Sequence, residues 1–545
     1  MFMSLVCVWQ SPEVCKDKMG LLSHPMGLLS QPIGVYSILK SVTLLPLLAV
    51  TLGLAYVLCV AIYNLFFHPL STYPGPWLWT VSDIPYSLVS VSGNAHKRML
   101  RIHMQYGPVV RVGPNTVFYS HPDATKEIRG HRKGSKAEHL KDPHLHSGNQ
   151  SNVIGADRKN HIRYRRSLAY GFSHQAMLNQ EPIINKYIDT LLTGLKNQST
   201  KQGKIDIVRW YNYTTFDIIG DLAFGEPFYC LEKSDYHPWV ALIFSGVKNL
   251  SLMSVCSKHG KLGKILAMLL VPKDLRAKGM QHRRLSIEKV RRRLDSGSSR
   301  PDFMTAMMTT RGSSEELTFK ELASNASLLI AAGSETTATA LSAATYYLGL
   351  YPKTFAKLAT EVRSAFCSEK DITLTNVQHL TYLQAVIDEA MRLFPSAPGT
   401  QPRIISPGGD TILGRYVPEG TVVGVWQWVN HHNPAHFHDA ESFIPERWLG
   451  GARFESDKRD AFMPFSIGPR NCIGRKNAKL GKLNYIVSLA YSEMKLILAR
   501  LVWNFDVKLA EESVGWDMRS KVYMLWEKGP IYVDLTRRKG SQTEP

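Results

Sequence analysis

The ten residues Phe465-Ser-Ile-Gly468-Pro-Arg470-Asn-Cys472-Ile-Gly474 are the most informative stretch of this 545-residue chain. Gly468 permits a tight turn that a residue with a Cβ atom resists, and Gly474 lets a flat ligand approach the backbone. A cysteine in such a loop, with free amide groups and Arg470 nearby, is expected to have a lowered pKa and to be a thiolate that can bind iron. A buried structural cysteine is the alternative, but it would not account for the glycines and the arginine around Cys472.

Composition narrows the class of protein. Apolar residues make up 44% and charged residues 20% of the chain, which excludes a wholly disordered, collagenous or coiled-coil protein. The seven cysteines include no C-x-x-C pair, so a reducing compartment is favoured over a disulfide framework. The formal net charge of +20 favours an anionic membrane face or an acidic protein partner, and a generally basic solvated surface explains it equally well. No nucleic acid is expected, because zinc-finger spacings and RNP motifs are lacking.

The N-terminal part contains a candidate membrane anchor. Residues 41–82 contain no Asp, Glu, Lys or Arg, and residues 44–67 within them are apolar and long enough to cross a bilayer core of ~30 Å. We expect a transmembrane anchor over residues 41–67. A buried core helix is the alternative, and a cleaved signal peptide fits less well because the apolar run is too long. Residues 1–40, with the repeat MGLLSHP-MGLLSQP, are expected to be a disordered or misassigned extension.

The rest of the chain, residues 68–545, reads as one large domain. Long helical patterns dominate, and short strand patterns cluster at residues 411–429. Residues 296–314 are the best loop candidate, but no linker divides the chain. The expected fold class is therefore mainly α, with minor β-sheets, behind one transmembrane helix.

A second motif, Ala332-Gly-Ser-Glu335-Thr336-Thr, lies inside a long predicted helix. The capping-box pattern Thr318-Phe-Lys-Glu marks the helix start, and Pro352 marks its end. Small residues at 331–333 would let a flat cofactor or O2 lie against the helix. An acid beside a hydroxyl is costly in an apolar helix unless it is used. The alternative is that the threonine only bonds to a carbonyl of its own helix.

Two further motifs come between the second motif and the cysteine loop. Glu389-Ala-Met-Arg392 lies on a helix that Pro395 ends, and Pro445-Glu-Arg447-Trp stands about 25 residues before the cysteine. The spacing of three places Glu389 and Arg392 on one helix face, where an exposed ion pair is worth only ~0.5 kcal/mol. Each fragment by itself is therefore a weak signal.

The four motifs together, in this order, resemble the cytochrome P-450 family over about residues 70–535. Short sequence stretches in the C-terminal part resemble fungal enzymes of specialised metabolism, in particular isotrichodermin-hydroxylase-like monooxygenases. The resemblance implies the cytochrome P-450 fold and heme b (iron protoporphyrin IX), with Cys472 as the thiolate ligand that donates electron density to iron, a role established for this family.

The resemblance also implies roles for other residues. Glu335 and Thr336 would relay protons, while Glu389, Arg392 and Arg447 would lock the haem side of the fold as structural residues. The residues implied in haem binding, including cations for its two propionates and the His-x-x-x-Arg pair that stands in place of a Trp-x-x-x-Arg motif, are Phe465, Gly468, Arg470, Gly474, His161, Arg165 and Arg403.

The function implied is that of a haem-thiolate monooxygenase. One oxygen atom from O2 would enter an apolar small molecule by hydroxylation or epoxidation, in a secondary-metabolite pathway such as a terpenoid or polyketide pathway. No flavin or nicotinamide fingerprint occurs in the chain, so electrons would come from NADPH through NADPH-cytochrome P-450 reductase. The enzyme would be a single-pass protein of the endoplasmic reticulum membrane with a cytosolic catalytic domain. The alternatives are a haem-thiolate isomerase or dehydratase without a reductase, and an inactive haem-binding membrane protein.

One departure from the family pattern matters. A Leu-Ala pair normally follows the cysteine after about five residues, but here Leu489-Ala490 comes 17 residues after Cys472. As continuous helix, the excess of about 12 residues, at 476–488, would displace the next helix by ~18 Å and turn it by ~120°. Either this segment loops out, or it is absent from the natural protein, for example as a retained intron. We favour the second interpretation; if the segment is real, haem binding is in doubt.

Overall fold

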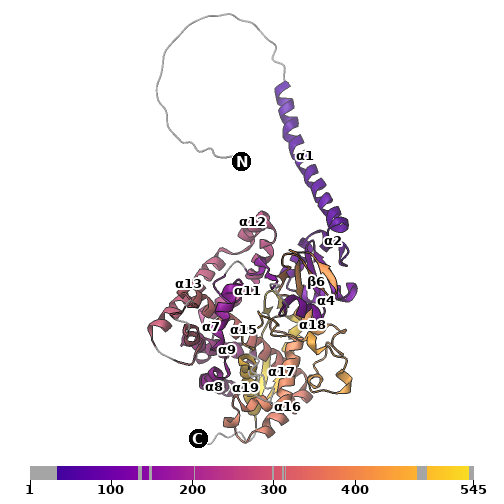
Figure 1. The fold of residues 1–545 in the computed structure, drawn as a ribbon. Helices are drawn as coiled ribbons and strands as arrows, with labels where there is room; N and C mark the ends of the chain where they lie inside the picture. The colour runs from indigo at the N-terminus through magenta and orange to yellow at the C-terminus, as the bar shows by residue number, and fades with distance from the viewer. Residues whose placement is uncertain are drawn as a thin grey trace, which may run out of the picture. The chain divides into compact units, whose positions relative to one another are not determined.

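The structure is a computed structural model that describes residues 33–132, 138–146, 150–201, 203–297, 300–309, 312–313, 315–475 and 488–538. The chain forms two compact units, Met1–Val60 and Ala61–Pro545. The described part of the first unit is the apolar helix α1 (Ile33–Ile62), which continues as a short π-helix (Tyr63–Phe67) (Figure 1). The span Leu45–Phe67 is long and apolar enough to cross a membrane. The helix begins at Ile33, ahead of the expected Ser41.

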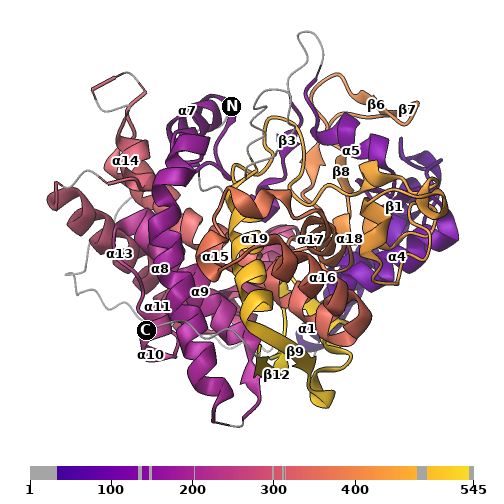
Figure 2. The same ribbon diagram turned by 90° about the horizontal axis from the view of Figure 1, so that it is seen from below.

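The second unit is mainly helical, which confirms the predicted fold class (Figures 1 and 2). Its helices are α2 (Trp77–Val81), α3 (Ile84–Val91), α4 (Ala95–Tyr106), α5 (Pro122–Arg129), α6 (Pro143–His146), α7 (Arg158–Ala169), α8 (His174–Ser199), α9 (Ile207–Phe224), α10 (Cys230–Lys233), α11 (Pro238–Ser257), α12 (Gly260–Leu270), α13 (Lys273–Asp295), α14 (Phe303–Met308), α15 (Phe319–Leu350), α16 (Pro352–Ala365), α17 (Thr381–Leu393), α18 (Gln427–His432), α19 (Leu489–Asn504) and α20 (Trp516–Arg519).

The strands are short and form small sheets. A five-stranded mixed sheet has the order β1-β2-β8-β5-β3, in which β2 and β8 are parallel and the other neighbours antiparallel. A three-stranded antiparallel sheet has the order β4-β12-β9, and β6-β7 and β10-β11 form hairpins. The strands are β1 (Val109–Gly113), β2 (Thr116–Tyr119), β3 (Leu140–Lys141), β4 (Ile205–Asp206), β5 (Arg403–Ile404), β6 (Asp410–Ile412), β7 (Arg415–Val417), β8 (Val422–Val425), β9 (Phe505–Leu509), β10 (Lys521–Val522), β11 (Trp526–Glu527) and β12 (Tyr532–Arg537).

Helix α15 is the centre of the core. It packs against α9, α13, α17, α19 and β9, and Figure 2 shows α15, α17 and α19 together in the middle of the unit. A helix that is apolar all round must be covered on all sides, and most residues from Leu322 to Leu348 are buried. The predicted capping box is present, with the Glu321 N–H donating to Thr318 Oγ1 at 3.3 Å and the Thr318 N–H donating to Glu321 Oε2 at 2.9 Å.

Two local expectations are wrong. Residues 427–429, expected as strand, belong to helix α18, where Trp428 stacks on His432 four residues later with ring centroids 3.8 Å apart. The helical spacing of this pair and its packing override the local strand propensity. The predicted loop at 296–314 contains α14, because Phe303, Met304 and Met307 are buried in the core.

Candidate functional site

The cysteine loop is closed by its own backbone. The Cys472 N–H donates to the carbonyl of Phe465 at 2.9 Å. Gly468 has φ of +77°, and a Cβ there would lie 1.9 Å from the carbonyl oxygen of Arg129. Both the left-handed backbone and the approach to the end of α5 therefore require glycine at this position, as the sequence predicted for the turn.

Gly474 leaves space beside the sulfur. A Cβ on Gly474 would lie 3.6 Å from Cys472 Sγ and 4.0 Å from the Cβ of Ala490, so it would fit sterically in the structure but occupy the region next to the sulfur. The Cys472 side chain lies deep in the domain, yet the residue keeps accessible surface. This arrangement fits a flat cofactor that is bound through the sulfur.

The sulfur's electrostatic surroundings differ from the sequence-based expectation. Burial raises the pKa of the Cys472 thiol above its ordinary value, and this effect outweighs the opposing one of the Gly474 and Arg475 amides and the Arg165 charge. The expected net lowering of the Cys472 pKa is therefore wrong, because the sequence pattern shows the amides and cations but not the desolvation. A thiol that coordinates a metal ion is deprotonated by the metal itself.

Helix α7 holds the loop from one side. Arg165 donates through Nη1 to the Asn471 carbonyl at 2.7 Å, and through Nη2 to the Asn471 side-chain oxygen. Arg165 thus contacts the residue just before the cysteine. The Phe465 ring lies 5.1 Å from the ring of Tyr491 on α19, which fixes the other end of the loop.

A cluster of basic side chains, buried or partly buried, lies beside the loop. Arg470 donates through Nε and Nη2 to Glu138 Oε1, at 3.0 and 2.7 Å. Burial, and then repulsion from Arg470, lower the pKa of Arg403 to about 10 and that of His161 to about 4. Burial lowers the pKa of Lys141 to about 7, with Arg470 and Arg403 contributing. The charge of Glu138 raises the pKa of all three groups and so partly offsets this lowering.

Arg129, which the sequence reasoning missed, belongs to the same cluster. It is 7% exposed, and burial followed by the charge of Arg403 lowers its pKa to about 9. Its Nη2 donates to the Val425 carbonyl at 3.2 Å, but its buried Nε has no hydrogen-bond partner among the described residues. The sequence offered one signal for this residue: Arg129 follows the apolar Ile128 on the buried face of α5.

These cations fit the cofactor that the resemblance implies. Buried cations that repel one another and leave a donor without an acceptor favour the binding of anions. Haem carries two carboxylates. The charged Arg129, Arg403 and Arg470, together with Lys141 and a ring N–H of the neutral His161, provide donors for them beside Cys472.

The side chains of the motif on α15 lie in different surroundings. A Cβ on Gly333 would lie 2.9 Å from Ile219 Cδ1, so this glycine permits close packing on α9. Ala332 is exposed in the middle of this mostly buried helix, so it faces accessible space. The prediction that small residues leave room on α15 therefore fits Ala332, while Gly333 also serves the packing of α15 on α9.

Glu335 and Thr336 do not bond to each other. The Thr336 hydroxyl donates to the Ala332 carbonyl at 2.6 Å, which is the back-bonding alternative. The Glu335 carboxylate accepts from the Thr339 hydroxyl at 3.2 Å and from Lys528 Nζ. Adjacent helical positions point ~100° apart, which explains the separation.

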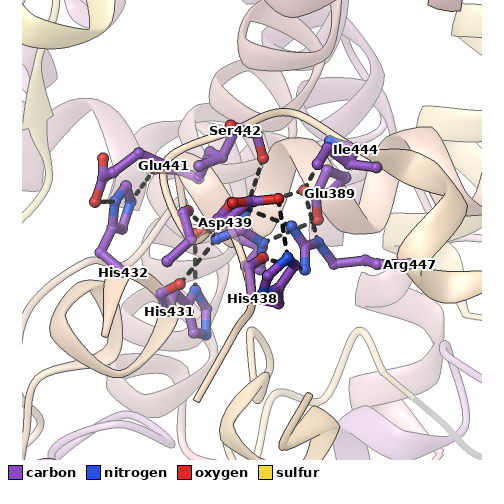
Figure 3. Close-up of polar contacts among 12 residues, drawn as sticks. Glu389, His431, His432, His438, Asp439, Glu441, Ser442, Ile444 and Arg447 are labelled. Atoms are coloured by element: carbon purple, nitrogen blue, oxygen red, sulfur yellow. Dashed lines mark hydrogen bonds and ion pairs between the residues drawn. The ribbon is translucent and has the colours of Figure 1, made fainter. Parts of the chain in front are cut away.

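Glu389 and Arg447 point toward one another in Figure 3, and Arg392 joins them in one buried cluster. Glu389 accepts from Arg392 Nε and Nη2 at 2.9 and 2.8 Å, and from Arg447 Nε at 2.9 Å. Their side chains are at most 1% exposed. Burial by itself would raise the pKa of Glu389, but the two guanidinium groups outweigh it and lower that pKa. The weak exposed pair considered from sequence is thus a fully buried one.

The remaining donors of the two arginines connect separate segments of the chain. Arg392 donates to the carbonyls of His431 and Ala440 at 2.9 and 2.6 Å, and Arg447 to Asp457 Oδ2 at 2.6 Å. The cluster therefore joins α17 to the segment that leads into the cysteine loop.

The extra segment after the cysteine begins and ends close to the loop. Residues 476–487 lie outside the described residues. Ser488 Oγ donates to the Gly474 carbonyl at 2.5 Å, and α19 begins at the next residue. Helix α19 packs against α15, α16 and α17, so the displacement that a continuous helical insertion would cause is not present.

Comparisons with known proteins agree with this geometry. A family model described as cytochrome P450 matches residues 69–535. A trichothecene C-15 hydroxylase of Fusarium sporotrichioides is 49% identical over 503 residues, covering 91% of this chain and 99% of that protein. The cytochrome P450 monooxygenase astJ of Aspergillus oryzae is 41% identical, with 88% and 95% covered. An averantin hydroxylase of Dothistroma septosporum is 40% identical, with 89% and 90% covered.

Proposed function

Because the chain belongs to the cytochrome P450 family and is a monooxygenase, we propose that it binds haem b with the Cys472 thiolate as the iron ligand. The observation that carries this proposal is the cation cluster beside the cysteine loop, with the orphaned Nε of Arg129. Arg129, Lys141, His161, Arg403 and Arg470 would hold the two propionates. When bound, the haem supplies the activation of O2 that oxygen insertion needs.

The residues of the chain have distinct tasks around this cofactor. The amides of Gly474 and Arg475 and the charge of Arg165 stabilise negative charge on the sulfur. Arg165 orients the loop through Asn471, and the Glu389 cluster keeps the loop's approach fixed. Glu335, held as an ion pair, is the group on α15 that can hold a proton near the open face of the helix. Thr336 has lone pairs left to accept a hydrogen bond.

The substrate that we propose is an apolar small molecule of fungal-type secondary metabolism, hydroxylated at a C–H bond. The relative at 49% identity is named for trichothecene hydroxylation, which favours a terpenoid of that kind over the polyketide named by the averantin hydroxylase. Titration of the purified protein with a trichothecene, followed by the haem Soret band, tests this choice. A shift with the terpenoid and none with averantin is expected.

Electrons would come from NADPH through NADPH-cytochrome P450 reductase. The span Leu45–Phe67 would anchor the protein in the endoplasmic reticulum membrane, with a cytosolic catalytic domain. A haem-thiolate isomerase needs no electrons, so product formation that requires both NADPH and added reductase separates the two functions. Fractionation of cells that express the tagged full chain tests the location.

The central experiment is the difference spectrum of the reduced, carbon monoxide-bound full-length protein. We expect the red-shifted Soret band of a thiolate ligand, and we expect Cys472→Ala to abolish it. Cys230→Ala is the matched control, because Cys230 is a buried cysteine with no part in the loop. A wild-type protein without this band would support the alternative of an inactive protein. Retention of the band in Cys472→Ala would refute the assignment of Cys472 as the ligand.

A further inference from the structure

Lys528 reaches Glu335 from the other end of the sequence. Its Nζ donates to Glu335 Oε1, and the two side chains are 5% and 6% exposed. Lys528 lies directly after β11, in the turn that leads to β12, 193 residues from its partner. No motif of the sequence includes it.

The turn that carries Lys528 is fixed on both sides. Trp526 donates through Nε1 to the Pro395 carbonyl at 2.7 Å, and its ring stacks on Phe394 with centroids 3.9 Å apart. On the other side, Trp516 donates through Nε1 to the Gly529 carbonyl at 2.8 Å. The backbone around Lys528 is therefore set before its side chain contacts α15, which reduces the entropy that the ion pair must overcome.

The same region is tied to the neighbouring position on α15. Ser396, next to the carbonyl that Trp526 binds, donates through Oγ to the Thr336 carbonyl at 2.7 Å. The Glu335-Thr336 pair is thus connected to the C-terminal turn by two routes, one through an ion pair and one through the segment after α17.

The ion pair uses only part of the carboxylate. Glu335 Oε1 receives Lys528 and the Thr339 hydroxyl, while Oε2 is buried with no hydrogen-bond partner among the described residues. A buried carboxylate is costly unless it is paired, so the lysine is what permits a charged Glu335 at this depth. Tyr236 is a further titratable group near Glu335, since the charge of Glu335 contributes to the raised pKa of Tyr236, after burial.

We propose that Lys528 is the positioning residue of Glu335: it fixes the carboxylate through Oε1 and leaves Oε2 available to accept a hydrogen bond from a proton-bearing group. The inference rests on the proposed function only because the proposed monooxygenase reaction gives this position a use. Lys528 itself does not contact the reacting atoms.

The first test is a double-mutant cycle on the thermal unfolding of the haem-loaded full chain, with Lys528→Met, Glu335→Gln and the double variant. Each single change should lower the midpoint, because one leaves a buried charge unpaired and the other weakens a charge-assisted bond. The double variant should lose less than the sum of the two. Additive effects would overturn the pairing, and Lys528→Arg, which keeps the charge, should recover most of the midpoint.

The second test separates positioning from general stability. The rate of NADPH oxidation with purified reductase and O2 alone is measured against pH, so that no substrate has to be known. Lys528→Met should lower this rate across the pH range several-fold, because the carboxylate loses the charge that holds it in place, and Glu335→Gln should lower it at least as much. Lys528→Arg should restore the wild-type profile.

The matched control is Lys289→Met, which breaks another ion pair of the same unit, to Glu226 at 2.6 Å, without contact to α15's motif. It should leave the pH profile unchanged. An unchanged profile in Lys528→Met, with the carbon monoxide spectrum intact, would refute the inference and leave the proposed function standing. A wild-type protein without that spectrum would instead refute the proposed function.

Discussion

The Glu389 cluster and the cation cluster beside the cysteine loop are both largely buried, but only the first is balanced within the chain. Glu389 accepts from two arginines whose remaining donors meet carbonyls and Asp457. Beside the loop, Arg403 and Arg470 share the single carboxylate Glu138, and Arg129, next to Arg403, has an Nε without a partner among the described residues. A balanced cluster needs no further partner and is costly to break, whereas an unbalanced one favours the binding of an external anion.

The largest effect should come from breaking the balanced cluster. Glu389→Gln leaves the buried Arg392 without a carboxylate counterion and Arg447 with Asp457 alone, and removing one partner of a buried pair typically costs ~3–5 kcal/mol. We expect little folded, haem-loaded protein, measured by the carbon monoxide spectrum and by thermal unfolding. Arg453→Gln is the control, since its pair with Asp439 is exposed and worth at most about 1 kcal/mol. Equal losses in both variants would contradict this view of Glu389.

A smaller effect should come from a substitution in the unbalanced cluster. Its sign should differ between the haem-free and the haem-loaded protein. Arg129→Gln removes a poorly satisfied charge from the haem-free protein and a propionate donor from the haem-loaded one. Charge-assisted bonds contribute ~1.5–3 kcal/mol, so haem affinity should fall about tenfold to a hundredfold while the haem-free protein is no less stable. Haem titration and unfolding of the haem-free form measure the two effects.

The exposed Arg158, on α7, provides the control for that experiment. Arg158→Gln should change neither haem affinity nor stability. A haem-free Arg129→Gln protein that is strongly destabilised would show that Arg129 is already satisfied inside the chain.

A pH effect should distinguish the clusters further. The pKa of Lys141 is lowered to about 7 by burial and by Arg470 and Arg403. Propionates would raise this pKa, so the haem-loaded state holds more proton at Lys141. Affinity should therefore rise as pH falls toward 7, by up to about 1.4 kcal/mol per pH unit, and level off below 7. Lys141→Arg should flatten the dependence relative to wild type. Cys472 contributes equally to the pH dependence of haem affinity in wild type and in Lys141→Arg, so subtracting one from the other removes its contribution. Identical slopes in the two proteins would show that Lys141 does not contribute to haem binding.

The smallest effect should follow deletion of residues 476–487. The Ser488 hydroxyl already meets the Gly474 carbonyl, and loop-closure entropy changes slowly with length. Haem content, the carbon monoxide spectrum and the unfolding midpoint should stay near those of the full chain. Loss of haem in the shortened protein would show that the segment takes part in the site.

Local chemistry made much of this predictable. The capping box, the end of α15 before Pro352 and the end of α17 before Pro395 follow from rules that act within a few residues. The Gly468 turn was also expected, although the close approach of Arg129 was not. Where tertiary contacts compete with local preference, prediction failed: residues 427–429 are helical.

The sequence by itself determined the class of fold, the loop around Cys472 and the identity of the residues that fill it, because motif spacing and helix signals are local. Only the tertiary structure decided which charges are balanced. Burial, which raises the Cys472 pKa, and partners that are hundreds of residues away, such as Val425 for Arg129, depend on packing. Electrostatic energies depend on distance and desolvation in three dimensions. Neither quantity can be derived from the order of residues alone.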